Sequence, residues 1–193
     1  MLALCAAPAW AQTDDGGVSP DQSTGTQPTT QNTGGAEFGA DSNPIPRETV
    51  PGTQAVLLDS GYAAAPADAP PQVQEAVWAA NEIQDKPYVW GGGHGSFDAK
   101  GYDCSGTVSY ALHAAGLLRR PRDSGSLMRY GASGIGRWFT IYTNSGHAYV
   151  VIAGLRLDTS AAGDRGATRG NGPRWRQTNR PQRGFRVRHP IGF

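Results

Sequence analysis

The composition of the chain changes near Pro70, and this change limits where a folded core can form. Residues 12–69 are rich in Thr, Gln, Gly, Asp, Pro and Ala and contain almost no aromatic residue. Such a segment cannot bury enough apolar surface to offset its chain entropy. We therefore expect residues 12–69 to be a disordered acidic tail or linker, with Gln54–Leu58 as a small apolar island that could dock as a strand. Residues 70–193 are expected to form one domain.

Charge is divided at the same boundary. Residues 1–69 carry one basic and eight acidic side chains, whereas residues 70–193 carry sixteen basic and eight acidic ones. The basic half suits an anionic partner, but charge alone does not choose between nucleic acid, anionic lipid and an anionic polymer. No apolar run approaches the ~18–20 residues of a membrane-spanning helix, so the sequence predicts no such helix.

The first residues resemble the end of a secretory signal. Met1–Ala11 is short and apolar and ends in Ala9-Trp10-Ala11, which predicts cleavage after Ala11 and a secreted protein. A basic region ahead of the apolar stretch is missing, and a floppy N-terminus is the alternative. After cleavage Cys104 would be the one remaining cysteine, which suggests a reactive thiol or an intermolecular bridge. The sequence has no C-x-x-C pair, and we expect no metal site.

Two helices are predicted after Pro70. The first lies between Pro70-Pro71 and Pro87, where apolar residues recur at helical spacing: Val73, Val77, Ala80 and Ile83. The second opens at Cys104, and Asp103 before it is a good N-cap residue.

The second half of the domain predicts strands. Aromatic and β-branched residues favour strands over 138–143, 147–152, 155–160 and 185–189, with a Gly/Arg-rich loop over 161–183. Helices followed by an antiparallel sheet indicate an α+β fold.

Cys104 is the candidate nucleophile. Exposed backbone N–H groups and the dipole at a helix N-terminus stabilise a thiolate, which is the nucleophilic form of cysteine. A base must orient this thiolate and protonate a leaving amine, and His147, at the start of a later strand, is the candidate. A helix Cys followed by a strand His is the order found in papain-like enzymes.

A third group should hold the imidazole. If Ala153-Gly154 is a two-residue turn, Asp158 lies diagonally from His147 on the same face of the hairpin. A three-residue turn would put Thr159 there instead. We favour Asp158, because a carboxylate stabilises an imidazolium better than a hydroxyl does.

Other conspicuous residues have structural interpretations. The glycine-rich run 91–96 lacks the Lys-Ser/Thr of a phosphate loop, and His94 and His113 lack metal-ligand spacing. Three tryptophans are expected in the core: Trp90, Trp138 and Trp175. The arginines of residues 165–188 are expected on a solvated face.

Three motifs together resemble the NlpC-type family of bacterial cell-wall cysteine peptidases. The motifs are Tyr88-Val89-Trp90-Gly91-Gly92, Gly101-Tyr102-Asp103-Cys104-Ser105-Gly106 and Gly146-His147-Ala148-Tyr149-Val150-Val151-Ile152-Ala153-Gly154. The resemblance spans about residues 71–160. It implies a papain-like domain that cleaves peptidoglycan stem peptides between D-glutamate and a diamino acid, outside the cytoplasm or at the cell wall, without a cofactor.

The resemblance also implies roles for particular residues. Cys104 would be the nucleophile, His147 the base and Tyr88 a residue near the nucleophile that helps the oxyanion. Asp103 and Ser105 would help to hold an amine of the stem peptide. Two departures bear on substrate preference: the third catalytic residue in the family is usually His, Asn or Gln rather than Asp158, and the loop between Tyr88 and Cys104 is longer and rich in glycine.

Several other functions remain open at this stage. The domain could be an inactive wall-binding or adhesion module, or an amidase or acyl-transferase that uses the same Cys–His pair. A nucleic-acid-binding role is weakly supported, because aromatic residues are scarce in the arginine-rich loop. We expect a monomer that meets stem peptides and anionic cell-wall polymers and does not bind nucleic acid.

Overall fold

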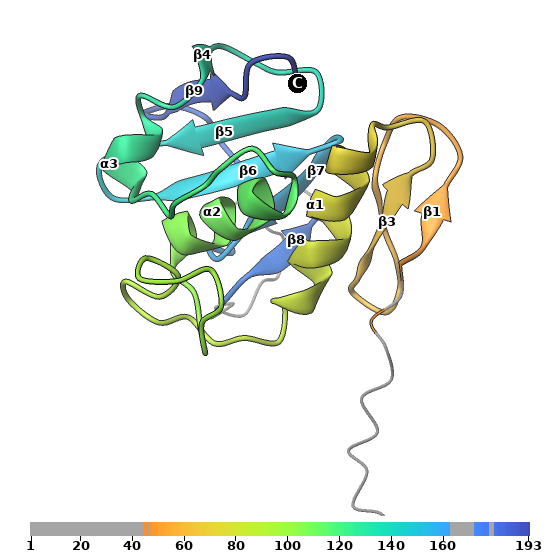
Figure 1. The fold of residues 1–193 in the computed structure, drawn as a ribbon, viewed down its shortest axis with the longest axis horizontal. Helices are drawn as coiled ribbons and strands as arrows, with labels where there is room; N and C mark the ends of the chain where they lie inside the picture. The colour runs from red at the N-terminus through yellow and green to blue at the C-terminus, as the bar shows by residue number, and fades with distance from the viewer. Residues whose placement is uncertain (1–44, 46, 163–171, 178–179) are drawn as a thin grey trace, which may run out of the picture. The chain divides into compact units, whose positions relative to one another are not determined.

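The computed structural model describes residues 45, 47–162, 172–177 and 180–193 (Figure 1). The predicted signal segment Met1–Ala11 and the predicted disorder of residues 12–44 lie outside these ranges. Within them, no helix is long and apolar enough to cross a membrane.

The centre of the domain is a six-stranded sheet in the order β4-β9-β5-β6-β7-β8. Every neighbouring pair in it is antiparallel. Its strands are β4 (Ala132–Ser133), β5 (Phe139–Thr143), β6 (Ala148–Ile152), β7 (Leu155–Asp158), β8 (Arg174–Arg176) and β9 (Arg186–His189). The predicted strands over 138–143, 147–152, 155–160 and 185–189 are confirmed to within two residues at each end.

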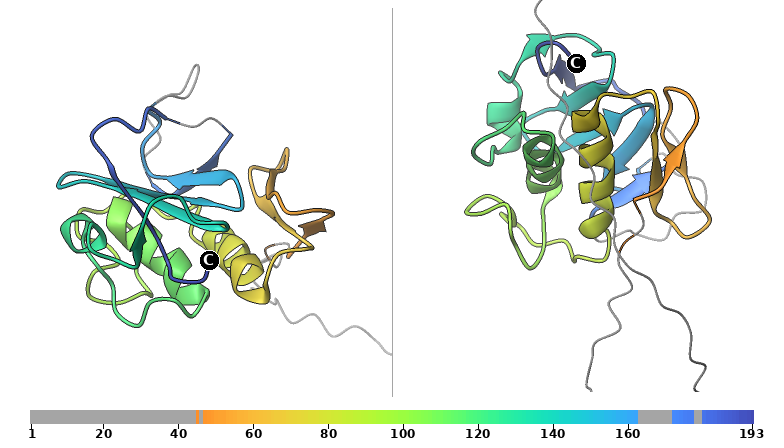
Figure 2. Two further views of the ribbon diagram at one scale, coloured as in Figure 1. Left: turned by 90° about the horizontal axis from the view of Figure 1, so that it is seen from above. Right: turned by 45° about the vertical axis from the view of Figure 1, so that its right-hand side comes forward.

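Two helices, α1 (Pro71–Glu82) and α2 (Cys104–Ala114), cover one face of this sheet (Figure 2, left). Proline at the first helical position starts α1, and the Asp103 side chain caps α2 by accepting a hydrogen bond from the Gly106 N–H. A short third helix, α3 (Ser124–Leu127), begins at the Asp123 cap. The α+β prediction is confirmed.

The core lies between the helices and the sheet. Apolar side chains of α1 and α2 meet those of β5, β6 and β7 there, and the fully buried ones include Val77, Leu112, Phe139, Ile141, Ile152 and Leu157. Trp138 and Trp175 join this core, as predicted.

The predicted boundary at Pro70 is wrong, because residues 47–69 are ordered. Strands β1 (Thr49–Val50), β2 (Val56–Leu57) and β3 (Ala63–Pro66) form a small sheet in the order β1-β3-β2 beside α1 (Figures 1 and 2). The alanines of β3 are fully buried, and β3 packs against α1. A run of alanines has little apolar surface, so composition did not reveal it.

The apolar island docks as a strand within this small sheet. Its β2 residues pair with β3, and the Ala55 N–H donates to the Ala153 carbonyl at 2.9 Å. The buried Asn81 of α1 holds β3 from the other side, because its side-chain amide exchanges two hydrogen bonds of 2.9 Å with the backbone of Ala63. The segment is therefore joined to the sheet and to α1.

The hairpin between β6 and β7 has the two-residue turn on which the Asp158 prediction depends. Ile152 pairs with Leu155, and Ala153 and Gly154 between them have φ values of +46° and +86°. Positive φ at both turn positions is typical of a type I′ hairpin turn.

The predicted loop over 161–183 is partly wrong. Arg174–Arg176 form β8, which pairs with β7 so that Trp175 lies opposite Leu157. A three-residue strand with two arginines lacks the apolar run by which strands are recognised in a sequence.

Candidate active site

The start of α2 presents Cys104 to a cleft. Its side chain is a free thiol, and the residue is 8% exposed. Gly106 in the same turn packs against the loop before the helix: a Cβ there would lie 2.0 Å from the Gly92 carbonyl oxygen. Glycine is therefore required at this position for the loop to approach the first turn beside the thiol.

His147 reaches the same region from the start of β6. The Asn144 side chain fixes the turn before it, since its Oδ1 accepts the N–H groups of Gly146 and His147 at 2.9 Å. The His147 Nε2 lies 2.9 Å from the Asp158 Oδ1, across the β6–β7 hairpin. The structure thus brings Asp158 rather than Thr159 to the imidazole.

The environment of His147 favours its protonated form. Burial of the ring lowers its pKa, but hydrogen bonds to the Asp158 carboxylate and to the Cys104 side chain, and the charges of both groups, raise the pKa to about 9. With Nε2 bonded to Asp158, Nδ1 is the nitrogen left for the Cys104 side. An imidazolium between a thiolate and a carboxylate is the arrangement that a cysteine nucleophile needs.

Asp158 is fully buried and holds more than the histidine. Its Oδ1 also accepts the Ser160 N–H at 2.8 Å, while its Oδ2 lies 3.2 Å from Arg180 Nη1 and 3.7 Å from Arg156 Nε. The guanidinium of Arg180 stacks on the rings of Tyr149 and Phe185. The expectation of a solvated arginine face is therefore wrong for Arg180 and for the buried Arg176, because both side chains help to enclose Asp158.

Tyr88 lies close to the nucleophile. Backbone hydrogen bonds tie Val89 and Pro87 to Tyr102, which places Tyr88 beside the residues that precede α2. Burial raises the pKa of Tyr88, and the neighbouring charges of Cys104 and Asp103 raise it further. Its phenol is therefore protonated at neutral pH and able to donate a hydrogen bond.

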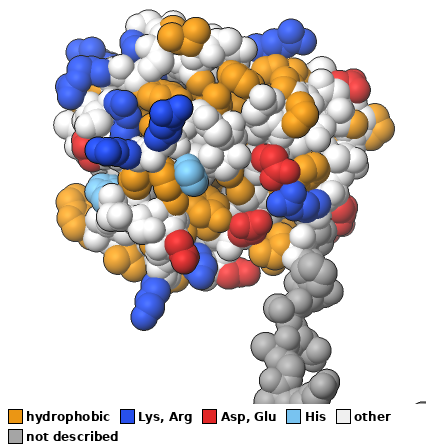
Figure 3. All heavy atoms as spheres, viewed as in Figure 1, with side chains coloured by type: hydrophobic (Ala, Val, Ile, Leu, Met, Phe, Trp, Pro, Cys, Tyr) orange, Lys and Arg blue, Asp and Glu red, His pale blue; other side chains and the backbone are white. Residues whose placement is uncertain are grey.

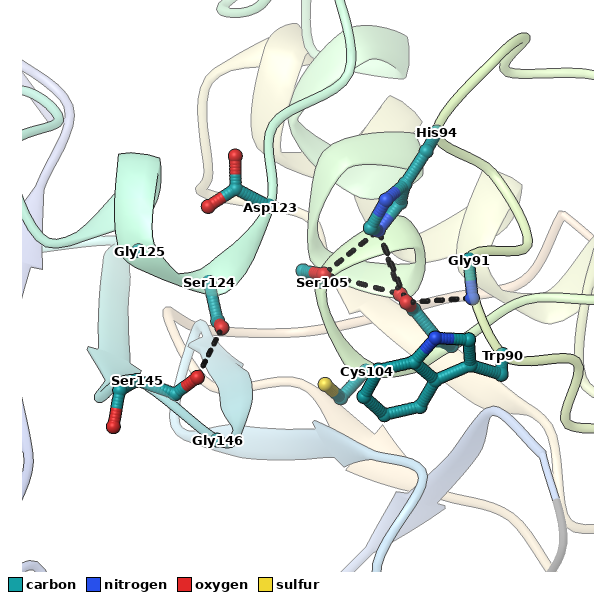
Figure 4. Close-up of a pocket in the computed structure, with 11 residues that line it drawn as sticks. Trp90, Gly91, His94, Cys104, Ser105, Asp123, Ser124, Gly125, Ser145 and Gly146 are labelled. Atoms are coloured by element: carbon teal, nitrogen blue, oxygen red, sulfur yellow. Dashed lines mark hydrogen bonds and ion pairs between the residues drawn. The ribbon is translucent and has the colours of Figure 1, made fainter.

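The cleft in front of Cys104 has a volume of ≈ 400 Å³. Trp90 and the glycine-rich loop form one side, and α3 with the turn before His147 forms the other; Figure 4 shows the Cys104 sulfur between Trp90 and Gly146. Trp90 is 86% exposed, so its predicted place in the core is wrong. Gly91 and Gly93 after it have φ values of +72° and +82°, and the indole lines the cleft.

Asp103 and Ser105 lie beside the nucleophile, but both contact a residue that the sequence did not single out for this place. The Nε2 of His94 lies 3.0 Å from the Ser105 hydroxyl and 3.0 and 3.1 Å from the two Asp103 oxygens (Figure 4). From the sequence, His94 is considered only as a metal ligand, and its spacing does not fit that role. Its contact with Asp103 depends on how the glycine-rich loop returns to α2, and no local pattern encodes this.

Charge is unevenly distributed over the face shown in Figure 3. Lys and Arg side chains gather on its upper left part, and Asp and Glu side chains lie mainly on its lower and right parts. The exposed Arg119, Arg120 and Arg122 line a second depression together with Ser126 of α3. Among the described residues, no three His, Cys, Asp or Glu side chains are grouped so as to hold a metal ion.

Residues 85–152 match the family model described as NlpC/P60. Over this segment, roughly a third of the 193 residues, the chain is similar to that family. The predicted resemblance is thereby confirmed, and the matched segment contains Tyr88, Cys104 and His147 but ends before Asp158. The role of Asp158 as the residue that orients His147 is therefore supported by the geometry of the hairpin alone.

One solved structure similar to this chain is an NlpC/P60 family protein from Bacillus cereus ATCC 10987, with a TM-score of 0.46 and 17% identity. The match covers 64% of this chain and 41% of that one, so the chain spans less than half of that protein. No curated protein matches the sequence.

Proposed function

We propose that this protein is a secreted or cell-wall-associated cysteine endopeptidase that cleaves peptidoglycan stem peptides between D-glutamate and a diamino acid. The observation that carries the proposal is the interaction of a helix-terminal thiol that lines a cleft, Cys104, with a histidine, His147, that is bonded to the buried carboxylate of Asp158. Proteins of the NlpC/P60 family are usually cell-wall peptidases, which supports this substrate class.

Cleavage would begin with the ion pair. The Cys104 thiolate attacks the peptide carbonyl carbon, and the carbonyl oxygen becomes an oxyanion. The Cys104 N–H belongs to the first turn of α2, where backbone N–H groups lack partners within the helix. It can donate to the oxyanion together with the protonated Tyr88, and one such donor typically contributes about 3–4 kcal/mol.

The proton of His147 then leaves with the amine. The C–N bond breaks, the imidazolium gives its proton to the leaving nitrogen, and a thioester to Cys104 remains. Water attacks the thioester, His147 removes a proton from that water, and the acid is released as the thiolate returns. Asp158 holds the ring through Nε2 and stabilises its positive charge at both stages.

The basic surface supports the same substrate class. Arg122 directly precedes Asp123, which lines the cleft, and together with Arg119 and Arg120 it suits an anionic wall polymer. Because such surface charges act on association more than on chemistry, they are expected to affect binding of intact wall rather than cleavage of a short peptide.

The deciding experiment is mass spectrometry of purified muropeptides after incubation with the full chain, with Cys104→Ala as the matched control. The proposal expects two fragments whose masses add up to the substrate plus one water and that are absent with Cys104→Ala. Binding of muropeptides without new masses would indicate a wall-binding module. Release of ammonia with uptake of one water and no break in the peptide would indicate an amidase, and joining of two peptides would indicate an acyl-transferase.

A further inference from the structure

The carboxylate of Asp103 lies in the cleft beside Cys104 and is almost fully enclosed. Its side chain is 7% exposed. Its Oδ1 accepts the Gly106 N–H at 2.7 Å and the Ser105 hydroxyl at 3.1 Å, and its Oδ2 accepts the Gly91 N–H at 3.1 Å. The remaining partner is His94, whose Nε2 reaches both oxygens.

These contacts leave no place on Asp103 for a further donor. A carboxylate has about four lone-pair sites, and an ionised one can only accept hydrogen bonds. The Nε2 of His94 must therefore carry the hydrogen that bonds Asp103, and the Ser105 oxygen shares it. A ligand with a cationic group can reach Asp103 only if it displaces the imidazole.

The backbone holds the imidazole in this position. Gly93, with φ of +82°, lies so close to α2 that a Cβ on it would be 2.8 Å from the Tyr102 ring and 3.0 Å from the Gly106 Cα. The next residue is His94, and its N–H donates to the Gly91 carbonyl at 3.2 Å. The loop is thus pressed against the helix at the point where the ring meets Asp103.

We propose that His94 is a specificity-determining residue that closes the Asp103–Ser105 subsite to ammonium groups. The cleft would accordingly prefer a peptide whose nitrogen at this subsite is acylated, as in the interior of a longer chain, over one with a free amine. For peptides this inference rests on the proposed function. It departs from the expectation that Asp103 and Ser105 hold an amine.

Charged thiol reagents can test, without any peptide, whether His94 closes the Asp103–Ser105 subsite to ammonium groups. In a Cys5→Ser background, Cys104 is the target of methanethiosulfonates, which its thiolate converts to a mixed disulfide while methanesulfinate leaves. The measured quantity is the rate with the 2-aminoethyl reagent, whose primary ammonium can donate to Asp103, divided by the rate with the neutral methyl reagent. His94→Ala should raise this ratio about tenfold or more, the size of one hydrogen bond to a charged group.

Two further variants make the result specific. His94→Gln keeps an N–H donor for Asp103 and should stay near the wild-type ratio. His113→Ala is the matched control, because His113 stacks on Phe97 of the same loop but does not line the cleft. An unchanged ratio in His94→Ala would overturn the proposal. So would an equal rise in His94→Gln or in His113→Ala, because the loop rather than the donor would then be responsible.

A peptide experiment extends the test to substrates. Matched stem peptides with a free or an acetylated N-terminal amine are compared by kcat/KM. The wild type should favour the acetylated peptide, and His94→Ala should reduce that preference about tenfold. A wild-type preference for the free amine would overturn the proposal. If neither peptide is cleaved but the reagent ratio changes as expected, the proposed function fails and the assignment of His94 stands.

Discussion

Two histidine–aspartate pairs of nearly equal length lie near Cys104: His94–Asp103 lines the cleft, and His147–Asp158 meets the Cys104 side chain. His147 lies 2.9 Å from Asp158, and His94 lies 3.0 Å from Asp103. The first pair is set in the sheet, with the Asp158 side chain fully buried and two arginines beside it. The second pair joins a glycine-rich loop to the N-terminus of α2, and its histidine is about one-third exposed.

The difference between the pairs lies in what the histidine can do next. The His147 ring has one nitrogen on Asp158 and interacts with Cys104 on its other side, so it can pass a proton between the thiol and a substrate. The His94 ring uses the same nitrogen, Nε2, for both Asp103 and Ser105. A short His–Asp distance is therefore not evidence of catalysis. The partner of the second nitrogen and the scaffold decide the role.

The largest expected effect separates the two histidines directly. His147→Ala should lower turnover of a stem peptide by about 10²–10⁴, the usual contribution of general acid–base catalysis. His94→Ala should change turnover of an acetylated peptide by less than about tenfold, because it alters recognition rather than proton transfer. Rates from muropeptide assays and melting curves of both variants provide the measurement. Equal losses at the two positions would contradict the distinction drawn between them.

The two carboxylates should also differ, and the effect of changing Asp158 is the next largest. Asp158→Asn should keep the fold and reduce turnover by up to about 10²-fold, because an amide can hold the ring but cannot stabilise its charge. Asp158→Ala should in addition cost about 3–5 kcal/mol in unfolding free energy, since Arg180 and Arg156 lose their buried counter-charge.

Thr159→Val is the control for Asp158. The two-residue turn points Thr159 to the other face of the hairpin, so turnover should be nearly unchanged. Turnover lost in Thr159→Val but retained in Asp158→Ala would show that Asp158 does not orient His147.

Much of the cleft could be predicted because its determinants are local. An Asp-Cys-Ser-Gly sequence supplies the N-cap, the thiol and a glycine for close approach within one helical turn, and the structure has each in that place. Likewise, Ala153-Gly154 fixes the hairpin register and so the pairing of His147 with Asp158.

What could not be predicted depends on contacts between distant segments. The alanines of β3 are buried against α1, where Asn81 bonds both backbone groups of Ala63, and β8 is a strand because β7 lies beside it. From composition alone, β3 is predicted to belong to the disordered tail and β8 to a loop. Trp90 and His94 depend in the same way on the path of a loop with several glycines, whose φ values a sequence pattern leaves open.

The pH dependence of turnover should also distinguish the His147–Asp158 pair from the His94–Asp103 pair, with a smaller effect than the substitutions above. The pKa of His147 is raised to about 9, so turnover that needs the imidazolium should persist to about pH 9 and fall above it. Asp158→Asn should move this limb toward the ordinary histidine value of about 6.5, because the carboxylate stabilises the charged ring. His94→Gln should leave the limb in place. Profiles of kcat against pH for the three proteins give the measurement.

The same shift predicts a pH-dependent contribution to stability. The folded-state pKa of His147 lies above the unfolded value, so its contribution is fully present below about pH 6.5 and is lost as the pH rises through about 9. Denaturant unfolding at pH 6 and pH 10 should show a smaller loss for Asp158→Asn than for the wild type. An identical loss in both would mean that Asp158 does not raise the pKa of His147.

The smallest expected effect on catalysis comes from the scaffold behind Asp158. Asn81 is 1% exposed and joins three segments: it bonds both backbone groups of Ala63, and its Oδ1 accepts the Trp175 Nε1–H at 2.8 Å. Trp175 lies opposite Leu157, one residue before Asp158. Asn81→Leu has a similar volume but leaves these buried groups without their partner, at a cost of about 1–3 kcal/mol for each unsatisfied group. We expect a lower melting temperature and a few-fold lower turnover at temperatures where the variant is folded. The ratio of thiol-reagent rates at Cys104 should not change, because the His94–Asp103 pair is held by the loop and α2 and not by β8. If that ratio changed while turnover stayed intact, the His94–Asp103 pair would depend on this scaffold and the His147–Asp158 pair would not. The contrast drawn here between the two pairs would then be wrong.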